Sequence, residues 1–263
     1  MTQGTDRMDL KRSIAAGLAA LLTASVAIAP ALAAPKFDAG QKTEIESIVR
    51  NYLITHPEVL VEAINALEAK RNAEADASQK QAIADNAKAI FSTPQGTVLG
   101  NPKGDVTVVE FFDYNCGYCR HAMSDMETLL KTDPKIRFVL KEIPVLGPQS
   151  VEASRVSLAF RKLRPELYAE FHRKLLGSRG VADEKRAIAV AAELGVSADA
   201  LKPVMASPEI AKDIAGDNEV AAALGVSGTP SYVIAGKVLV GAVGLDNLEA
   251  AIKNVRTCGS ASC

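Results

Sequence analysis

The pattern of apolar and polar residues predicts two helices near the start of the chain, followed by a polar arm. Residues 37–54 carry apolar side chains at three- and four-residue steps, the spacing of a helix with one apolar face. Asp38 and Gln41 have the spacing of a capping box at its beginning. Pro57 suits the first turn of a second helix. Between residues 68 and 88 the apolar residues are almost all alanine, so this stretch is predicted to be an exposed helical linker.

The pattern changes after loop signals at residues 91–104, where runs of apolar residues replace the helical spacing. Near-continuous apolar runs are typical of buried strands, and short runs around a Gly-containing turn are typical of a hairpin. The predicted elements are a strand at 106–112, a helix after Cys119, a strand at 136–143, a helical block at about 148–225, a hairpin at 231–240 and a closing helix at 245–255. This order indicates an α/β domain over residues 97–256 with an inserted helical domain.

The first residues have the composition of a secretory signal peptide. Basic residues precede an uncharged apolar run over residues 13–29, and Ala31-Leu32-Ala33 fits a small-residue cleavage site. An uncleaved membrane anchor is the alternative, but the run is shorter than the roughly 20 residues that a membrane span needs. Cleavage near Ala33 would export the protein, and the predicted location is the periplasm, where disulfides can form.

Composition narrows the function further. The 263 residues include 30 basic and 31 acidic side chains, and this balance gives no sign of the basic patch that nucleic-acid binding normally needs. Four cysteines are few for a fold held together by disulfides. Two of them, Cys258 and Cys263, lie in the tail at 257–263, where a local disulfide is the simple interpretation and a second redox relay or metal site is the alternative.

The other two cysteines form the motif Cys116-Gly117-Tyr118-Cys119 at the junction between a predicted strand and a predicted helix. The unpaired N–H groups and partial positive charge of a helix N-terminus favour a thiolate, so Cys116 is expected to have a lowered pKa and to act as the nucleophile. Cys119 is placed to resolve a mixed disulfide. A zinc or copper site and a static disulfide are the alternatives, although no further ligands with a zinc-site spacing are evident. No cofactor is predicted.

The N-terminal helices need a partner for their apolar stripe. A short helical pair cannot bury such a stripe by itself, so it can either meet copies of itself or fold back on the main domain. Self-association into a symmetric oligomer is the sharper hypothesis. His172, among apolar neighbours, is expected to be structural rather than catalytic.

Together these motifs resemble the DsbA-like branch of the thioredoxin superfamily, over roughly residues 97–256. The resemblance rests on the strand before the cysteines, the Cys-x-x-Cys motif, the helical insertion, and Val226-Ser227-Gly228-Thr229-Pro230 before the hairpin. The N-terminal arm is similar to the extension of ScsC-type proteins, which are exported disulfide isomerases that trimerise through the arm. The implied organisation is a signal peptide at 1–33, an oligomerisation segment at 34–67, a linker at 68–96, a thioredoxin domain at 97–256 and a tail at 257–263.

The resemblance also implies roles for individual residues. Pro230 would be a cis-proline facing the cysteines, and Thr229 would then offer its backbone to an extended substrate. Tyr118 is a further candidate for substrate contact. Glu110 matches the buried acid behind the cysteines, where burial would raise its pKa and let it relay the Cys119 proton; an outward-facing charge on a half-exposed strand is the alternative. Lys141 is a candidate counter-charge for Glu110.

One departure from the family pattern bears on the direction of electron flow. Gly117-Tyr118 stands where the strong oxidase DsbA has Pro-His, and Tyr118 brings no positive charge to the thiolate. The expected function is therefore a disulfide isomerase or reductase acting on exported proteins with wrong disulfides, and a disulfide oxidase is the alternative. The resemblance implies a homotrimer and a membrane thiol reductase of the DsbD or ScsB type as electron donor.

Overall fold

The structure, a computed structural model, describes residues 37–94 and 96–263. The predicted signal peptide lies outside the described residues. The chain divides into two compact units, one ending at Val61 and the other beginning at Glu62, and each is described by itself. None of the helices in the described residues is long and apolar enough to cross a membrane.

The first unit contains helix α1 (Ala39–Thr55) and the start of helix α2 (Glu58–Asp85). The predicted capping box is confirmed: the Gln41 N–H donates to Asp38 Oδ1 over 2.8 Å, and the Asp38 N–H donates to Gln41 Oε1 over 3.0 Å. No residue of α1 is buried. Large apolar side chains are therefore exposed along this unit: Ile45, Ile48, Val49, Tyr52, Ile54, Leu60 and Val61.

Helix α2 continues without a break across the predicted boundary between residues 67 and 68. Its last turns, which belong to the second unit, pack on the main domain. Ile83 is buried in one of the two apolar clusters of that domain, and Gln79 Oε1 accepts a hydrogen bond from the Val238 N–H over 2.9 Å. This end of the helix is therefore part of the domain, although the alanine-rich sequence predicted an exposed arm up to Lys88.

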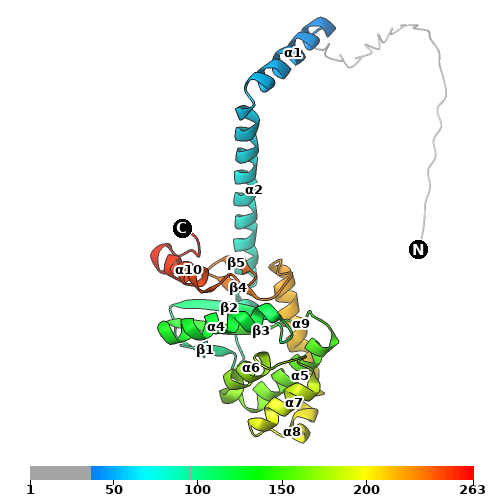
Figure 1. Cartoon of the computed structure of the whole chain (residues 1–263), viewed down its shortest axis with the longest axis vertical. Helices are drawn as coiled ribbons and strands as arrows, with labels where there is room; N and C mark the ends of the chain where they lie inside the picture. Colours follow the sequence, from blue (N-terminus) through cyan, green and yellow to red (C-terminus); the bar gives the residue numbers. More distant parts are fainter. Residues whose placement is uncertain (1–36, 95) are drawn as a thin grey trace, which may run out of the picture. The chain divides into compact units, whose positions relative to one another are not determined.

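A five-stranded mixed sheet forms the centre of the second unit (Figure 1), with the order β1-β3-β2-β4-β5. Strands β2 and β3 are parallel, and the remaining neighbours are antiparallel. Strand β1 was not predicted, because its three residues are too short for a pattern. The strands are β1 (Val98–Gly100), β2 (Val106–Phe112), β3 (Ile136–Glu142), β4 (Ser231–Ile234) and β5 (Lys237–Val240).

Helices cover both faces of this sheet. Helices α4 (Gly117–Thr132) and α10 (Leu245–Cys258) contact each other and one face, whereas α3 (Ala87–Phe91) and α9 (Pro208–Ala223) cover the other. Alternate residues of β2 accordingly enter two different apolar clusters: Val108 and Phe112 in one, Val109 and Phe111 in the other. This confirms the predicted α/β class with a thioredoxin-like core.

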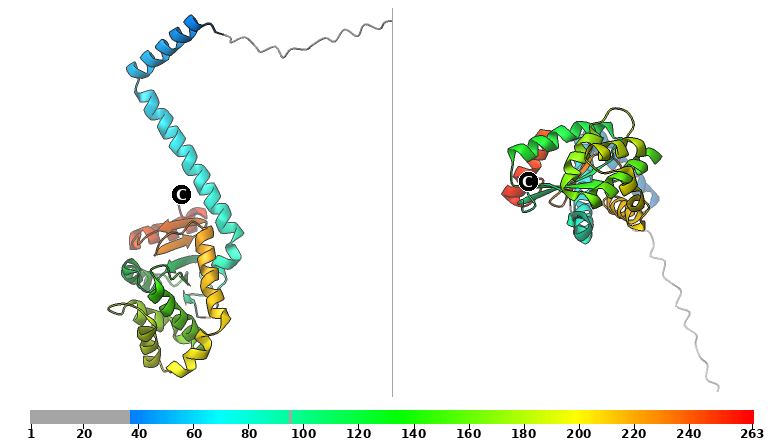
Figure 2. Two further views of the ribbon diagram at one scale, coloured as in Figure 1. Left: turned by 90° about the vertical axis from the view of Figure 1, so that its right-hand side faces the viewer. Right: turned by 90° about the horizontal axis from the view of Figure 1, so that it is seen from below.

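The predicted helical insertion follows β3 and gathers at one end of the sheet (Figures 1 and 2). In this part of the chain Ser197 caps α8 (Ala198–Met205) by accepting a hydrogen bond from the Ala200 N–H, and Ser207 caps α9 by accepting one from the Glu209 N–H. His172 is buried there against the rings of Phe112 and Tyr114, as expected of a structural residue. The inserted elements are α5 (Pro148–Leu163), the 3-10 helix η1 (Pro165–Leu167), α6 (Tyr168–Leu176), α7 (Glu184–Glu193) and α8 (Ala198–Met205).

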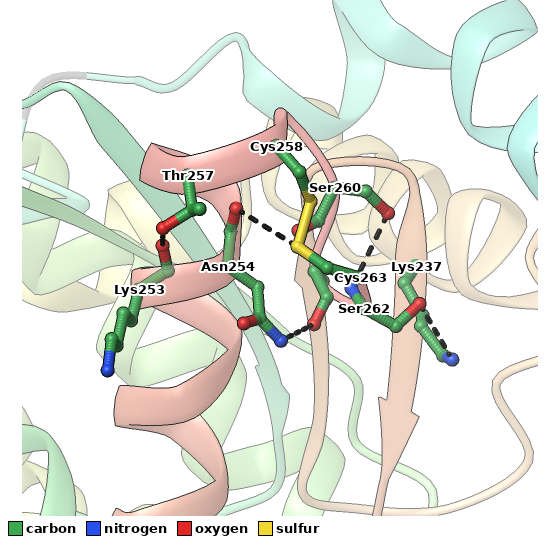
Figure 3. The surroundings of a disulfide bond; sticks show 9 residues. Lys237, Lys253, Asn254, Thr257, Cys258, Ser260, Ser262 and Cys263 are labelled. Atoms are coloured by element: carbon green, nitrogen blue, oxygen red, sulfur yellow. Dashed lines mark hydrogen bonds between the residues drawn. A yellow bond between two sulfur atoms is a disulfide. The ribbon is translucent and has the colours of Figure 1, made fainter.

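The tail folds back on α10 through a disulfide between Cys258 and Cys263 (Figure 3), as the simple interpretation of the tail predicted. The ring is held from both sides. Asn254 Nδ2 donates to the Ala261 carbonyl over 3.2 Å, and Lys237 Nζ donates to Ser262 Oγ over 3.3 Å. Ala261 is buried in the same apolar cluster as α4 and α10, so the tail is packed onto the domain.

Candidate active site

The Cys-x-x-Cys motif lies where β2 ends and α4 begins. Cys116 is the N-cap residue of α4, with extended backbone angles, and its Sγ accepts a hydrogen bond from the Cys119 N–H over 3.3 Å. The sequence produces this arrangement because a buried strand is followed by a short polar turn and then by helical spacing. Both cysteines carry unbridged thiols in this structure.

The surroundings of Cys116 lower its pKa to about 5. The largest cause is the hydrogen bond from the Cys119 thiol; the Thr229 side chain and the N–H groups of Cys119 and Tyr118 act in the same direction, against the effect of burial. These donors stabilise the thiolate more than the thiol. Cys116 is therefore largely ionised at neutral pH and is suited to nucleophilic attack on a disulfide.

Cys119 has the opposite properties. Its side chain is fully buried, and its pKa is raised, first by the hydrogen bond that it gives to Cys116 and then by burial. A thiol in this environment keeps its proton until a base is available. The two cysteines are therefore chemically distinct, one a thiolate and one a protected thiol.

The loop before β4 faces the cysteines from another part of the chain. The Thr229 carbonyl oxygen lies 3.1 Å from Cys116 Sγ, which donates to it when the thiol is protonated, and the Thr229–Pro230 peptide bond is cis. The structure therefore brings Thr229 next to Cys116 across 113 residues of sequence. Tyr118, between the two cysteines of the motif, has 71% of its surface exposed.

Glu110 lies behind the cysteines in β2. Only 2% of its surface is exposed, and its cross-strand neighbours are Leu140 and Tyr232. Burial raises its pKa to about 8, and the charges of Cys116 and Asp125 add to the effect. The alternative of an outward-facing carboxylate is therefore wrong, because this strand is covered on both faces.

The proposed pairing of Glu110 with Lys141 is also wrong. Lys141 is the strand partner of Phe111, so it points to the opposite face of the sheet. There its Nζ lies 2.8 Å from Asp217 Oδ1 of α9. A one-residue offset in register places a side chain on the other face of a sheet, which the sequence alone did not reveal.

Three residues of this site were missed by the sequence reasoning. Asp113, Asn115 and Ser150 form a hydrogen-bonded group beside Cys116: Asp113 Oδ1 accepts from the Asn115 N–H and from Ser150 Oγ, both over 2.8 Å. An Asp two residues before an Asn, directly after a strand, is a typical signal of an Asx turn. That signal could have indicated Asp113, whereas the contact with Ser150 depends on the tertiary fold.

No metal site accompanies these residues in the described ranges, 37–94 and 96–263: no three His, Cys, Asp or Glu side chains are grouped so that they could hold an ion. The tail cysteines are bonded to each other and not to Cys116 or Cys119.

Comparison with known proteins agrees with this geometry. Residues 107–253 match the family described as DSBA-like thioredoxin domain, and residues 41–74 match the copper resistance protein ScsC N-terminal domain. A thioredoxin-like oxidoreductase from Silicibacter pomeroyi has 41% sequence identity and a TM-score of 0.62; the similarity covers 66% of this chain and 99% of that one. A linker-deletion mutant of ScsC from Proteus mirabilis has 26% identity and a TM-score of 0.60, over 85% of this chain and 99% of that one.

This chain also matches part of a much longer relative. The Na(+)/H(+) antiporter NhaA 1 of Salinispora arenicola is 28% identical over 155 residues, which are 59% of this chain and 24% of the antiporter. This chain thus spans about a quarter of the length of that relative. More than half of the residues match one domain family, and an N-terminal segment matches the ScsC N-terminal domain. The chain therefore belongs to the DSBA-like thioredoxin domain family and is similar to its ScsC-type members.

Proposed function

We propose that the protein is a thiol–disulfide oxidoreductase that acts on disulfides of exported proteins, as an isomerase or reductase. The observation that carries this proposal is the contrast between its two cysteines. Cys116 has a pKa of about 5 at a helix N-terminus, and the buried Cys119 has a raised pKa one turn later. A static disulfide or a metal-holding pair needs no such difference in acidity.

The first step is attack of the Cys116 thiolate on a client disulfide. A Cys116–client disulfide forms, the client disulfide breaks, and one client cysteine leaves as a thiolate. A client segment that lies extended against Thr229 would present its sulfur to Cys116, since the Thr229 carbonyl is 3.1 Å from Sγ. The exposed ring of Tyr118 offers a further contact for that segment.

Two routes lead from the mixed disulfide. In isomerisation the client thiolate, or another client thiol, attacks the mixed disulfide; a new client disulfide forms and Cys116 is released as a thiolate. In reduction Cys119 attacks Cys116 Sγ, which leaves the client reduced and the protein oxidised. The Cys119 proton must then be taken up. The buried Glu110, with a pKa of about 8, is the candidate relay: its carbonyl oxygen accepts the Cys119 proton while its hydroxyl group releases its own proton to water. A membrane thiol reductase of the DsbD or ScsB type would return the two electrons.

The N-terminal unit supports a homotrimer. Its apolar side chains are exposed on α1 and at the start of α2, and exposed apolar surface of this extent is typical of a binding surface. Residues 41–74 match the N-terminal domain of ScsC, and the proposed trimer uses this segment. A trimer would present several Cys116 thiolates to one client and raise their local concentration. Export to the periplasm through a signal peptide cleaved near Ala33 completes the proposal.

The redox state of Cys116 and Cys119 in the native compartment tests the direction of the reaction. Cells are quenched with acid, thiols are alkylated, and the peptide with both cysteines is weighed; Cys258 and Cys263 are scored separately. A mostly reduced pair supports an isomerase or reductase, because only the thiolate attacks a wrong disulfide. A mostly oxidised pair would instead support a disulfide oxidase.

Activity of the purified chain tests the reaction class. Insulin reduction and the recovery of ribonuclease from a scrambled, fully oxidised form are measured for the native chain and for Cys116→Ser. The substitution should abolish both activities, whereas Cys258→Ser/Cys263→Ser should retain them. Activity that persists in Cys116→Ser would refute the assignment of the nucleophile.

A further inference from the structure

The Asp113 carboxylate is the centre of a buried hydrogen-bond network beside the cysteines. Its surface is 1% exposed, yet four donors reach it. Oδ1 accepts from the Asn115 N–H and from Ser150 Oγ, and Oδ2 accepts from the N–H groups of Val145 and Leu146 over 2.9 and 3.0 Å. Buried carboxylates are costly unless their acceptors are used, so this group holds its surroundings in one arrangement.

The backbone of Asp113 contacts both cysteines of the motif. Its carbonyl accepts the Cys116 N–H over 3.0 Å, which closes the turn between β2 and α4. A backbone hydrogen bond from Asp113 also favours the thiolate form of Cys119. The side chain therefore fixes a residue whose main chain already determines where Cys116 lies.

Asn115 extends the network to the helical insertion. Its Nδ2 donates to Ser150 Oγ over 3.0 Å and to the Ala182 carbonyl over 2.9 Å, and its Oδ1 accepts the Ala182 N–H over 2.8 Å. Ser150 belongs to the first turn of α5, and Ala182 lies between α6 and α7. The residue before the nucleophile is thus tied to two separate segments of the insertion.

We propose that Asp113 is a positioning residue that holds Cys116 at the N-terminus of α4. Its Oδ1 binds the turn at Asn115, and its Oδ2 binds the loop before α5. This inference rests on the proposed thiol–disulfide chemistry. It assigns to the insertion a role in thiolate reactivity, because α5 and the segment before α7 keep the turn in place through Ser150 and Asn115.

The carboxylate is suited to this role because it offers two acceptor oxygens and no donor. In Asp113→Asn one oxygen becomes an NH2 group. If the remaining oxygen keeps the Val145 and Leu146 N–H groups, the NH2 group faces the Asn115 N–H, and two donors then oppose each other. The turn would move, Cys116 Sγ would lose part of its contact with the Cys119 N–H, and the thiolate would be less stable.

The experiment measures the pH profile of Cys116 alkylation by iodoacetamide in the full reduced chain, with mass spectrometry to confirm the site. We expect Asp113→Asn to raise the midpoint by about half a pH unit or more, which lowers the alkylation rate below the midpoint by about 3-fold or more. Asn115→Ala should shift the midpoint in the same direction. Ser197→Ala, which removes the cap of the distant helix α8, should lower stability and leave the midpoint unchanged.

The outcomes separate this inference from the proposed function. A wild-type midpoint in both Asp113→Asn and Asn115→Ala, with lowered stability, would show that the network is structural only and would overturn the inference. If Asp113→Asn does not fold, Ser150→Ala decides alone: it removes one donor to Asp113 Oδ1 and keeps the Val145 and Leu146 contacts, so a wild-type midpoint in this variant would overturn the inference. Failure of the native chain to reduce insulin would refute the proposed function, whatever the alkylation profiles show.

Discussion

The buried carboxyl group of Glu110 should make the reduced protein less stable as the pH rises. Its pKa is raised from 4.5 to about 8 in the folded state. The group is therefore protonated in the folded chain and ionised in the unfolded chain between these values. The stability that the protonated form contributes is fully present below pH 4.5 and is lost as the pH rises through 8. Glu110→Gln, which has the same shape and no charge, should remove this loss.

The magnitude follows from the size of the shift. Each unit of pKa difference corresponds to about 1.4 kcal/mol, so the variant should be more stable than the native chain by about 5 kcal/mol above pH 9. At pH 7, where the folded group is still mostly protonated, the expected gain is about 3 kcal/mol, and at pH 4 it is close to zero. Because the Cys116 charge contributes to the raised pKa of Glu110, the gain should be smaller in the oxidised protein, where Cys116 is bonded to Cys119.

Urea unfolding of the reduced protein at pH 4, 5.5, 7 and 8.5 measures this effect, with the native chain and the variant at one protein concentration. Glu249→Gln is the matched control, since Glu249 is exposed on α10. The reasoning would be refuted by a gain that does not change with pH, or by a loss of stability at pH 8.5. Either result would mean that the Glu110 carboxylate is stabilised in the folded state.

Three further predictions concern other parts of the molecule. Glu142 is buried with a pKa of about 7, so its ionisation should destabilise the folded chain over a lower pH range than that of Glu110. The stability advantage of Glu142→Gln over the native chain should grow by about 3 kcal/mol between pH 4 and pH 8 in the same unfolding assay, and any weakening of the Tyr168 and Ser157 hydrogen bonds would lower the stability of the variant. An advantage that does not change with pH would contradict this prediction. Removing the tail disulfide with Cys258→Ser/Cys263→Ser should lower the free energy of unfolding by about 2 kcal/mol, a modest loss because the loop that the disulfide closes is short. An unchanged denaturation midpoint would contradict this and would show that the packing of Ala261 holds the tail without the disulfide. Ile48→Glu should convert the proposed trimer to monomers in light scattering while insulin reduction persists; a particle mass that stays trimeric would locate the contact elsewhere.

The sequence predicted those parts of the fold that depend on local pattern. The capping box of α1 and the strands around the Cys-x-x-Cys motif were predicted because their signals lie within a few residues. Strand β1 was missed because three residues carry no periodicity. The prediction that Lys141 pairs with Glu110 was wrong. Their contact depends on which face of the sheet each side chain takes, and the strand register that decides this is a property of the tertiary fold.

The same distinction applies to the site. Cys116 and Cys119 were identified from a motif at a predicted strand–helix junction, and Glu110 was identified from the family resemblance. The nearness of Thr229 to Cys116 came from the family resemblance and not from the residues themselves, since 113 positions separate them. The Asp113 network was missed, because three of its four donors come from residues 145–150, which the chain reaches only after β3.

The contact between Gln79 and Val238 has a consequence for the exposed edge of the sheet. Strand β5 is an edge of the sheet, and an open edge is a template on which an unfolded chain can add a strand and begin to aggregate. If the protein acts on misfolded chains, as proposed, this hazard arises at every encounter. By accepting the Val238 N–H, the Gln79 side chain of α2 removes a donor that an incoming strand would need, and this lowers the capacity of the β5 edge to pair with another chain.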